Sequence, residues 1–319
     1  MEKDKISVIV PMYNAGRTVE RCISSITGGY QNIEIIVVND GSTDATQEII
    51  EKLANIDKRI FWFTQNNQGP GSARQTGLKK VTGKYVAWCD ADDWYEPDFL
   101  ETLYKYLITY NADIAVCQAQ IPGNKKEYNS GDVQCWNRDE AINLFLEHKQ
   151  LNGVLWNKLI KKDMFDKIDF DKSLWYWEDL QVVWKLLQKA KRVVKINQAK
   201  YNFFVHPESI CASTYNPKRY YASRKVWDSI VEDCAKPELK LYLEKAEIRR
   251  FIWLYGDLRL MLKEDYKKKE DMKEIQDIMK KTGKKGLKSL EGVHRIFALL
   301  IMQNIWLASI PFKLQRVLK

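Results

Sequence analysis

Short apolar runs alternate with segments of helical periodicity along the first part of the chain. Apolar runs that predict strands lie at residues 6–10, 33–38, 60–63, 85–88 and 114–117. Helical spacing and helix-start signals predict helices at residues 19–26, 44–54, 73–80 and 98–110. Because strands that are apolar on both faces are typical of parallel sheets covered by helices, the pattern predicts an α/β fold. Right-handed crossovers would place the loops after these strands at one edge of the sheet.

The pattern changes in the later part of the chain. Residues 193–196 and 201–205 predict two further strands. After these strands the sequence becomes Lys-rich, and helical periodicity replaces the strand signals. We therefore predict an α/β domain at residues 1–215 and a helical, basic and amphipathic region at residues 216–319.

The composition indicates a globular, basic protein. Of 319 residues, 45% are hydrophobic and 12% are aromatic, which is not typical of a disordered chain. A net charge of +9 indicates an anionic substrate or membrane, and the absence of a nucleic-acid-binding signature predicts no nucleic-acid partner. The six cysteines form no Cys-x-x-Cys pair, so we expect reduced core residues of a cytoplasmic protein. The sequence contains no signal-peptide pattern and no apolar run of the roughly 20 residues that a membrane span needs.

Three carboxylates gather directly after the apolar run at residues 85–88. Asp90, Asp92 and Asp93 lie within four positions. Ligands of open α/β sheets bind at the carboxyl ends of the strands, and carboxylates there suit Mg²⁺ or Mn²⁺, which usually bridge protein to phosphate. We therefore interpret this acidic turn as a metal site that holds a nucleotide diphosphate. The alternative is a solvated turn that caps the next helix through Glu96.

Five short motifs follow one another along the chain. They are residues 7–14, Val-Asn-Asp-Gly-Ser-Thr-Asp at 38–44, Gly-Ser-Ala-Arg-Gln at 71–75, Asp-Ala-Asp-Asp at 90–93 and Glu-Asp at 178–179. Over roughly the first 210 residues, this order resembles the family 2 glycosyltransferases of the bacterial surface-polysaccharide type, which have the GT-A fold. The resemblance implies a Rossmann-like, mostly parallel sheet and a UDP-sugar donor. The donor-binding residues that it implies are Pro11, Tyr13, Asn14, Asp40, Arg74, Asp90, Ala91, Asp93 and Trp177.

Two of these residues take specific roles from the resemblance. The Asp40 carboxylate would accept a hydrogen bond from the uracil N–H, with Pro11 and Tyr13 beside the base. Formation of the Asp-Gly-Ser turn is an alternative role for Asp40, and both roles can hold together. Arg74, at a predicted loop-to-helix junction, would contact the diphosphate or the ribose, and its alternative is a surface salt bridge. Gln75 follows it, where the family commonly has Asn.

The resemblance also implies the metal ligands. Asp92 matches the main ligand, and Asp90 lies nearer the ribose or a bridging water. Asp93 would orient the turn or touch the donor sugar. His206 matches a further ligand of some related enzymes, and its alternative is a loop histidine that is hydrogen-bonded to backbone. The implied cofactor, Mn²⁺ or Mg²⁺, would neutralise charge on the departing diphosphate.

A second acidic pair, Glu178 and Asp179, precedes a predicted helix. Glycosyl transfer with inversion needs a carboxylate that accepts the proton of the acceptor hydroxyl, and Asp179 matches the family's base position, with Glu178 beside it. The alternative is capping of the helix N-terminus, which would lower the pKa of Asp179, whereas neighbouring carboxylates would raise it. Trp175 and Trp177 could form an acceptor platform or only pack. Lys158 could meet a phosphate, the acceptor, or only protein groups.

Basic and apolar blocks lie side by side near the end of the chain. Lysines cluster between residues 267 and 285, and apolar residues follow between residues 297 and 308. This pattern favours a segment that lies on a bilayer surface, so we predict peripheral contact with an anionic membrane through residues 290–319. The alternative is packing on the catalytic domain or on a second copy, as in a homo-oligomer.

These features together predict an inverting, metal-dependent glycosyltransferase. It would transfer a hexose or N-acetylhexosamine from a UDP-sugar to a glycan, a lipid-linked glycan or a polymer, at the inner face of the plasma membrane. One alternative is a sugar nucleotidyltransferase, which usually has a Gly- and Arg-rich phosphate loop where this chain has residues 11–17. Another is a non-catalytic, membrane-associated scaffold that retains the nucleotide-binding fold.

Overall fold

The chain divides into two compact units. A computed structural model describes residues 3–122, 130–205, 216–264, 266 and 268–317, with side chains described up to residue 312. The sheet unit comprises Met1–Phe145 and Lys149–Ser209, and the helical unit comprises Leu146–His148 and Ile210–Lys319.

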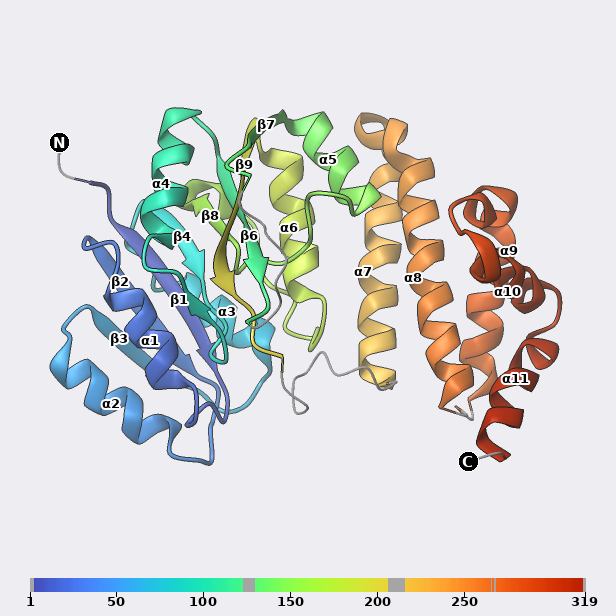
Figure 1. The fold of residues 1–319 in the computed structure, drawn as a ribbon, viewed down its shortest axis with the longest axis horizontal. Helices are drawn as coiled ribbons and strands as arrows, with labels where there is room; N and C mark the ends of the chain where they lie inside the picture. Colours follow the sequence, from blue (N-terminus) through green and yellow to red (C-terminus); the bar gives the residue numbers. More distant parts are fainter. Residues whose placement is uncertain (1–2, 123–129, 206–215, 265, 267, 318–319) are drawn as a thin grey trace. The chain divides into compact units, whose positions relative to one another are not determined.

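A nine-stranded sheet is the centre of the sheet unit (Figure 1). Its strands are β1 (Ile6–Met12), β2 (Ile33–Asn39), β3 (Ile60–Thr64), β4 (Tyr85–Trp88), β5 (Trp94–Tyr95), β6 (Ile114–Gln120), β7 (Val133–Asn137), β8 (Lys158–Lys161) and β9 (Arg192–Asn202). The strand order is β3-β2-β1-β4-β8-β6-β9-β5, and β7 pairs with β9. The pairings β2–β3, β1–β2, β1–β4 and β6–β9 are parallel, which confirms the predicted mostly parallel sheet.

The sequence pattern did not predict the antiparallel strands. β8 lies antiparallel between β4 and β6, and β5 and β7 pair antiparallel with β9. β5 has two residues and β7 has largely exposed side chains, so neither shows a clear apolar period. β9 is one strand of 11 residues, and the prediction of two strands was wrong because Ala199 in its polar middle still pairs with Gln118 of β6.

Helices cover both faces of this sheet (Figure 1). They are α1 (Val19–Thr27), α2 (Thr46–Ile56), α3 (Pro70–Leu78), α4 (Phe99–Thr109), α5 (Arg138–Glu147) and α6 (Glu178–Lys189). Val8 of β1 shares a core cluster with residues of α1 and α4. Ile9 contacts α3 on the other face, where a Cβ atom on Gly77 would lie 2.5 Å from the Ile9 side chain. Burial on both faces explains the continuous apolar sequence of β1.

The loops after β1, β2 and β4 meet at one edge of the sheet, as predicted. The backbone N–H of Asp40, after β2, donates to the carbonyl of Met12 at 2.8 Å. The N–H of Cys89, after β4, donates to the carbonyl of Ile9 at 3.1 Å. This edge therefore brings the acidic turn close to the segment that contains Asp40.

Helices make up most of the described part of the helical unit, which confirms the predicted helical C-terminal region. They are α7 (Pro217–Ala235), α8 (Leu243–Lys263), α9 (Lys269–Lys288), α10 (Gly292–Gln303) and α11 (Ile305–Val317). Phe251 of α8, Ile275 of α9 and Ile301 of α10 belong to one buried core cluster. Among the described residues, none of the helices has the length and apolar character needed to cross a membrane.

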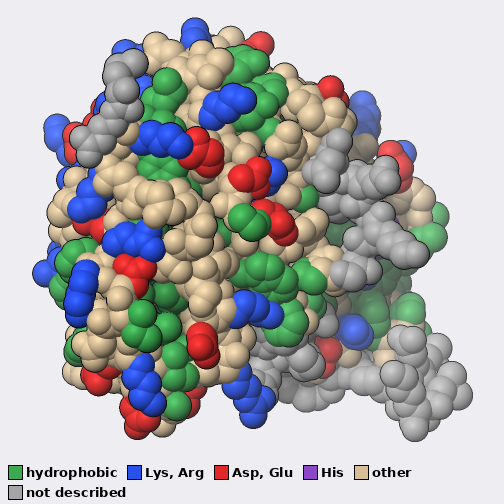
Figure 2. All heavy atoms as spheres, turned by 60° about the vertical axis from the view of Figure 1, so that its left-hand side comes forward, with side chains coloured by type: hydrophobic (Ala, Val, Ile, Leu, Met, Phe, Trp, Pro, Cys, Tyr) green, Lys and Arg blue, Asp and Glu red, His purple; other side chains and the backbone are tan. Residues whose placement is uncertain are grey.

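The positive charge of the protein is unevenly distributed along the sequence. Residues 216–319 contain 24 Lys and Arg and 14 Asp and Glu, a balance of +10, whereas residues 1–215 contain 27 and 28, a balance of −1. Figure 2, in which the left-hand side of Figure 1 comes forward, shows Lys and Arg side chains interspersed with Asp and Glu side chains. The excess of basic residues therefore comes from the C-terminal third of the chain.

Candidate active site

The acidic turn after β4 is held by the carboxylate of its last residue. Asp93 is 1% exposed, and its carboxylate accepts hydrogen bonds from the Tyr201 hydroxyl at 2.7 Å and the Phe204 N–H at 2.8 Å. Burial, followed by the nearby charges of Asp90 and Asp92, raises the pKa of Asp93 to about 8. This geometry favours a role in orienting the turn over contact with the donor sugar.

Arg21 of α1 supports the same turn and was not predicted from the sequence. Its guanidinium lies 3.9 Å from the ring centroid of Trp94 and 4.9 Å from that of Phe204. Its Nη2 also donates to the Asp92 carbonyl at 2.7 Å. Such stacking with a hydrogen bond fixes a planar guanidinium in place. No motif contains Arg21, so only the packing of α1 against the turn reveals this role.

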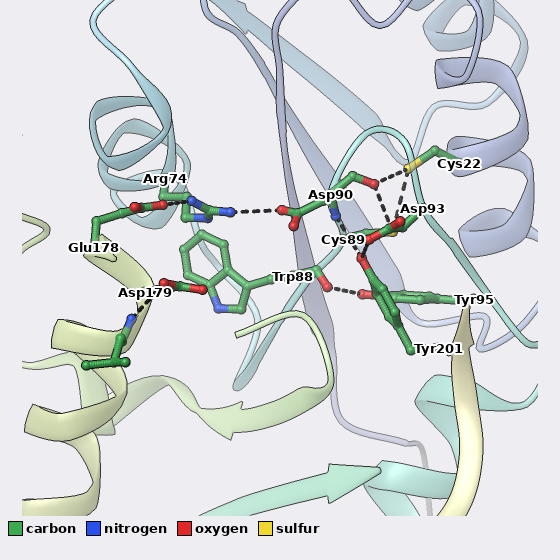
Figure 3. A network of polar contacts seen from close by, with 11 residues as sticks. Cys22, Arg74, Trp88, Cys89, Asp90, Asp93, Tyr95, Glu178, Asp179 and Tyr201 are labelled. Carbon is green, nitrogen blue, oxygen red and sulfur yellow. Dashed lines mark hydrogen bonds and ion pairs between the residues drawn. The ribbon is translucent and has the colours of Figure 1, made fainter. Parts of the chain in front are cut away.

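Two buried thiols lie beneath the turn. The sulfur atoms of Cys22 and Cys89 are 3.6 Å apart, and each lies 3.6 Å from the carbonyl oxygen of Asp90 (Figure 3). Burial, with the neighbouring Cys22, raises the pKa of Cys89, so this thiol stays protonated and behaves as a core residue.

Arg74 connects the acidic turn to the second acidic pair. It lies within α3, which begins at Pro70, and not at the loop-to-helix junction that the sequence predicted. Its Nη2 donates to Asp90 Oδ1 at 2.8 Å, and its Nη1 forms an ion pair with Glu178. Figure 3 shows the guanidinium lying between these two carboxylates.

The environment of Arg74 differs from that of a surface salt bridge. Arg74 is 8% exposed and Glu178 is 4% exposed. Burial alone would lower the pKa of Arg74, but the charges of Glu178 and Asp90 outweigh burial and raise it. Arg74 therefore stays charged, and it brings together carboxylates that are far apart in the sequence.

Glu178 and Asp179 are the first two residues of α6, and their environments differ. Glu178 is buried against Arg74, whereas Asp179 is partly exposed and accepts a hydrogen bond at Oδ1 from the N–H of Leu180 at 2.7 Å. Burial, followed by the charge of Glu178, raises the pKa of Asp179 to about 7, although Arg74 acts in the opposite direction. Asp179 therefore has the pKa that a general base needs near neutral pH.

Trp177 immediately precedes this helix with a backbone conformation that is rare for a bulky residue. Its φ of 66° lies in the left-handed region, and it occupies the N-cap position of α6. Backbone strain of this kind gathers at functional sites. Its predicted place beside the bound sugars stays a prediction.

Asp40 organises the loop that leads into α3. Its carboxylate accepts hydrogen bonds from the Gln65 side chain at 2.8 Å, the Gln68 N–H at 3.0 Å and the Gly69 N–H at 2.8 Å. Gly41, with a φ of 74°, allows the sharp turn after it. A carboxylate has about four acceptor positions, so the predicted hydrogen bond from uracil could still form beside these contacts.

The other predicted donor-binding residues lie at the same edge. Tyr13 is 51% exposed, so its ring is accessible for stacking, and Pro11 is partly exposed at the end of β1. Asn14 connects two loops, because its Oδ1 accepts from the Thr43 N–H at 2.8 Å. Ala91 packs partly against the core between the two candidate metal ligands.

The acidic turn offers ligands that suit a divalent cation. Asp92 is partly exposed, and 29% of the Asp90 side chain is exposed while its Oδ1 contacts Arg74. In the described part of the chain, no group of three or more His, Cys, Asp or Glu side chains is arranged around a metal position, and His206 lies outside it. Mg²⁺ commonly binds through one or two carboxylates together with substrate phosphates and water, so Asp92 and Asp90 fit such an ion.

The fold is similar to that of solved structures with the same mixture of strands and helices. The crystal structure of S. aureus TarS 1-349 matches with a TM-score of 0.69 at 19% identity, covering 97% of this chain and 88% of that chain. The complex of TarS 1-349 with UDP-GlcNAc matches with a TM-score of 0.71 at 18% identity, covering 97% and 89%. The likeness confirms the predicted GT-A fold.

The sequence comparisons identify the family. Residues 7–169 match the family described as Glycosyl transferase family 2. Glycosyltransferase GlyA of Streptococcus pneumoniae serotype 4 is 36% identical over 225 residues, which are 65% of this chain but 31% of that protein. The putative glycosyltransferase EpsH of Bacillus subtilis is 28% identical over 271 residues, covering 82% of this chain and 78% of that protein. The chain belongs to glycosyl transferase family 2 and is a glycosyltransferase.

Proposed function

We propose that the protein transfers a hexose or N-acetylhexosamine from a UDP-sugar to a hydroxyl of a glycan, a lipid-linked glycan or a polymer, with inversion and with a divalent metal. The observation that carries this proposal is the Arg74 bridge between Asp90 of the acidic turn and Glu178 beside Asp179. It puts a diphosphate position and a candidate base into one network. The binding of UDP-GlcNAc to TarS supports the donor class, and the Mn²⁺ in the GDP-Man complex of a Pyrobaculum calidifontis mannosyltransferase, which matches with a TM-score of 0.54, supports the metal.

The donor would lie along the edge formed by the loops after β1, β2 and β4. Tyr13 would stack on the uracil ring, and the remaining acceptor position of Asp40 would bind its N–H. Mn²⁺ or Mg²⁺, held by Asp92 and Asp90, would neutralise negative charge on the diphosphate. Arg74 would add a positive charge at the same position.

Asp179 is the carboxylate that is available for proton transfer. Glu178 is buried and ion-paired with Arg74, so it orients the arginine and does not act as a second base. The Asp179 carboxylate would accept the proton as the acceptor oxygen forms its bond to the anomeric carbon. The bond from that carbon to the diphosphate oxygen breaks in the same step, and its electron pair leaves with UDP. One displacement on the face opposite UDP inverts the anomeric configuration.

Substitutions at both ends of the network test this proposal. Asp179→Asn should reduce UDP release by at least about a thousandfold with UDP binding retained, because the amide cannot accept the proton. Asp92→Ala should weaken Mn²⁺-dependent UDP binding. Asp163→Asn, at an exposed aspartate in the sheet unit, is the matched control and should behave as wild type.

Each competing interpretation gives a different result in this assay. Full transfer activity in Asp179→Asn would refute the base assignment. Release of pyrophosphate from a nucleoside triphosphate would instead indicate a sugar nucleotidyltransferase. Absence of UDP release with a panel of donors and glycan acceptors, together with retained membrane binding, would indicate the non-catalytic scaffold.

We also propose that the enzyme works on the inner face of the plasma membrane and contacts it through residues 290–319. Apolar side chains that are each at least 38% exposed lie on α10 and α11, namely Val293, Ile296, Leu299, Leu300, Trp306, Leu307 and Ile310. After Glu291 the sequence has four Lys and Arg residues and no Asp or Glu. Exposed apolar groups beside positive charge suit the headgroup region of an anionic bilayer. Contact of this kind would bring the enzyme to a lipid-linked acceptor.

A vesicle-binding assay tests the membrane contact. The full chain should sediment with phosphatidylglycerol vesicles and much less with phosphatidylcholine vesicles. The double variant Trp306→Ser, Ile310→Ser should lose about tenfold in binding because apolar surface is removed. Ile56→Ser is the matched control, because Ile56 is 83% exposed on α2. Equal binding to both vesicle types, or a dimer in solution that the double variant dissociates, would contradict the proposal.

A further inference from the structure

We propose that Lys158 is a positioning residue for the catalytic base: it fixes the segment 152–154 against the first turn of α6 and supplies a buried positive charge that acts on Asp179. This inference rests on the proposed function, because it needs Asp179 as the base. It assigns Lys158 neither to the donor nor to the acceptor, the two ligands that the sequence suggested.

Lys158 lies in the middle of the sheet with its ammonium group enclosed by protein oxygens. It belongs to β8, pairs with Val116 of β6, and is 0% exposed. Its Nζ donates to the Val154 carbonyl at 2.5 Å, to the Asn152 carbonyl at 3.2 Å and to Asn157 Oδ1 at 2.9 Å. A buried ammonium group is tolerated when oxygens surround it in this way. A phosphate could not reach it without displacing these contacts.

Asn157 fixes the position of this ammonium group relative to β6. Its Nδ2 donates to the Cys117 carbonyl at 2.9 Å, and its own carbonyl accepts from the Cys117 N–H at 3.0 Å. The same side chain presents Oδ1 to Lys158. Lys158 therefore joins the rigid β6 strand to the segment 152–154.

That segment in turn packs against the residue that follows the base. A Cβ atom on Gly153 would lie 2.6 Å from the side chain of Leu180, so glycine permits a very close approach to α6. The backbone N–H of Leu180 donates to Asp179 Oδ1 at 2.7 Å. A continuous chain of contacts thus runs from the Lys158 ammonium group through Gly153 and Leu180 to the carboxylate of the base.

Lys158 and Asp179 also attract one another electrostatically. Burial lowers the pKa of Lys158 to about 7, against the raising effect of Asp179 and Cys117, and Lys195 of β9 adds to the lowering. Because a Coulomb interaction is mutual, a charged Lys158 favours the ionised form of Asp179.

Other charges around Asp179 also shift its pKa. They are Glu178 on the same helix, Arg74 of α3 and Asp90 of the acidic turn. None of them changes when Lys158 is substituted. Loss of the Lys158 charge should therefore raise the pKa of Asp179, and the acidic side of the rate profile should move to higher pH.

The test compares Lys158→Met with Lys161→Met in the full chain. Lys161 lies on the same strand, and its Nζ contacts Asp113 Oδ1 at 2.9 Å, so Lys161→Met removes a lysine charge from β8 without touching the segment 152–154. In Lys158→Met, kcat should fall by about tenfold or more because the segment 152–154 loses its anchor, and the acidic midpoint of the kcat–pH profile should rise by less than about one pH unit. Lys161→Met should keep the wild-type midpoint.

Gly153→Ala tests the contact chain without removing the charge. Its added methyl group should displace Leu180, so kcat should fall while the KM for the donor and the pH midpoint stay close to wild type. If Lys158→Met does not fold, as judged by thermal melting, Gly153→Ala still tests the contact chain from the segment 152–154 to Asp179.

Three outcomes separate this inference from the proposed function. Wild-type pH midpoint and kcat in a folded Lys158→Met would overturn the role of Lys158, and wild-type kcat in Gly153→Ala would overturn the contact chain. Both outcomes leave the proposed function intact if Asp179→Asn is inactive. An active Asp179→Asn would instead overturn the base assignment itself.

Discussion

The acidic turn and the start of α6 are two acidic sites with the same pair of environments, but different contacts hold their buried carboxylates. Each has one buried carboxylate, Asp93 or Glu178, beside a partly exposed one, Asp92 or Asp179. Asp93 is held by hydrogen bonds from a hydroxyl and a backbone N–H, whereas Glu178 is held by the ion pair with Arg74. We infer that the buried member orients each site and that the partly exposed member contacts the ligand.

The different support explains why the two sites should respond differently to substitution. The donors to Asp93 are uncharged, so the loss of one of them leaves the other in place and should weaken the support of the turn only in part. A buried ion pair that loses one partner leaves an uncompensated charge, which is far more costly. Arg74 also contacts Asp90, so the start of α6 and the turn share one cation.

Arg74→Met should have the largest effect, because it removes the cation common to both sites. The buried Glu178 would lose its partner, and we expect a loss of stability of about 3–5 kcal/mol together with a fall in UDP release of at least about a thousandfold. Urea denaturation and a UDP-release assay measure the two effects. Arg59→Met, which breaks the partly exposed Asp57 ion pair, should cost no more than about 1 kcal/mol. Equal stability losses in the two variants would show that the Arg74 bridge has no special role.

Asp93→Ala should affect the turn alone. Without the bonds to Tyr201 and Phe204, we expect Mn²⁺-dependent UDP binding to weaken by about 10- to 100-fold, as is common when the support of a ligand is lost. Isothermal titration measures this binding. Tyr201→Phe should also weaken binding, because the Tyr201 hydroxyl donates to Asp93 and accepts from the Asp90 N–H at 3.1 Å. Wild-type affinity in Asp93→Ala would mean that the buried carboxylate does not orient the turn.

Glu178→Gln should separate the two sites by their pH dependence. The activity of the wild type should rise with pH through about 7, because Asp179 must be ionised and its pKa is raised to about 7. Glu178 raises that pKa, so its neutral replacement should move the acidic midpoint to lower pH, by about one unit. Asp93→Asn should leave the midpoint in place. Measuring kcat as a function of pH in the three proteins gives these midpoints. A higher midpoint in Glu178→Gln than in the wild type would contradict the electrostatic argument.

The parts that could be predicted from the sequence are those whose signal is local. The apolar strands β1, β2 and β4 are buried on both faces, and the acidic turn and Glu178-Asp179 are short contiguous motifs. β8 was missed because a buried lysine occupies its first position. The support from Arg21 depends on Asp92, Trp94 and Phe204, which are distant in the sequence. The partners of Lys158 are close in the sequence, but only the structure shows that its ammonium group is buried among them.

Arg21→Met should have the smallest effect, because the turn keeps its Asp93 contacts. Loss of the stack on Trp94 and of the bond to the Asp92 carbonyl should weaken Mn²⁺-dependent UDP binding by about two- to fivefold, which corresponds to roughly 0.5–1 kcal/mol for an exposed cation–π contact. Lys105→Met on α4 is the matched control, since its ammonium lies 5.8 Å from the Tyr106 ring centroid. If the Asp93 contacts are the main support of the turn, Arg21 only adds to them, so Arg21→Met must weaken binding less than Asp93→Ala. Equal losses in the two variants would mean that the stack of Arg21, and not the buried Asp93 carboxylate, is the main support.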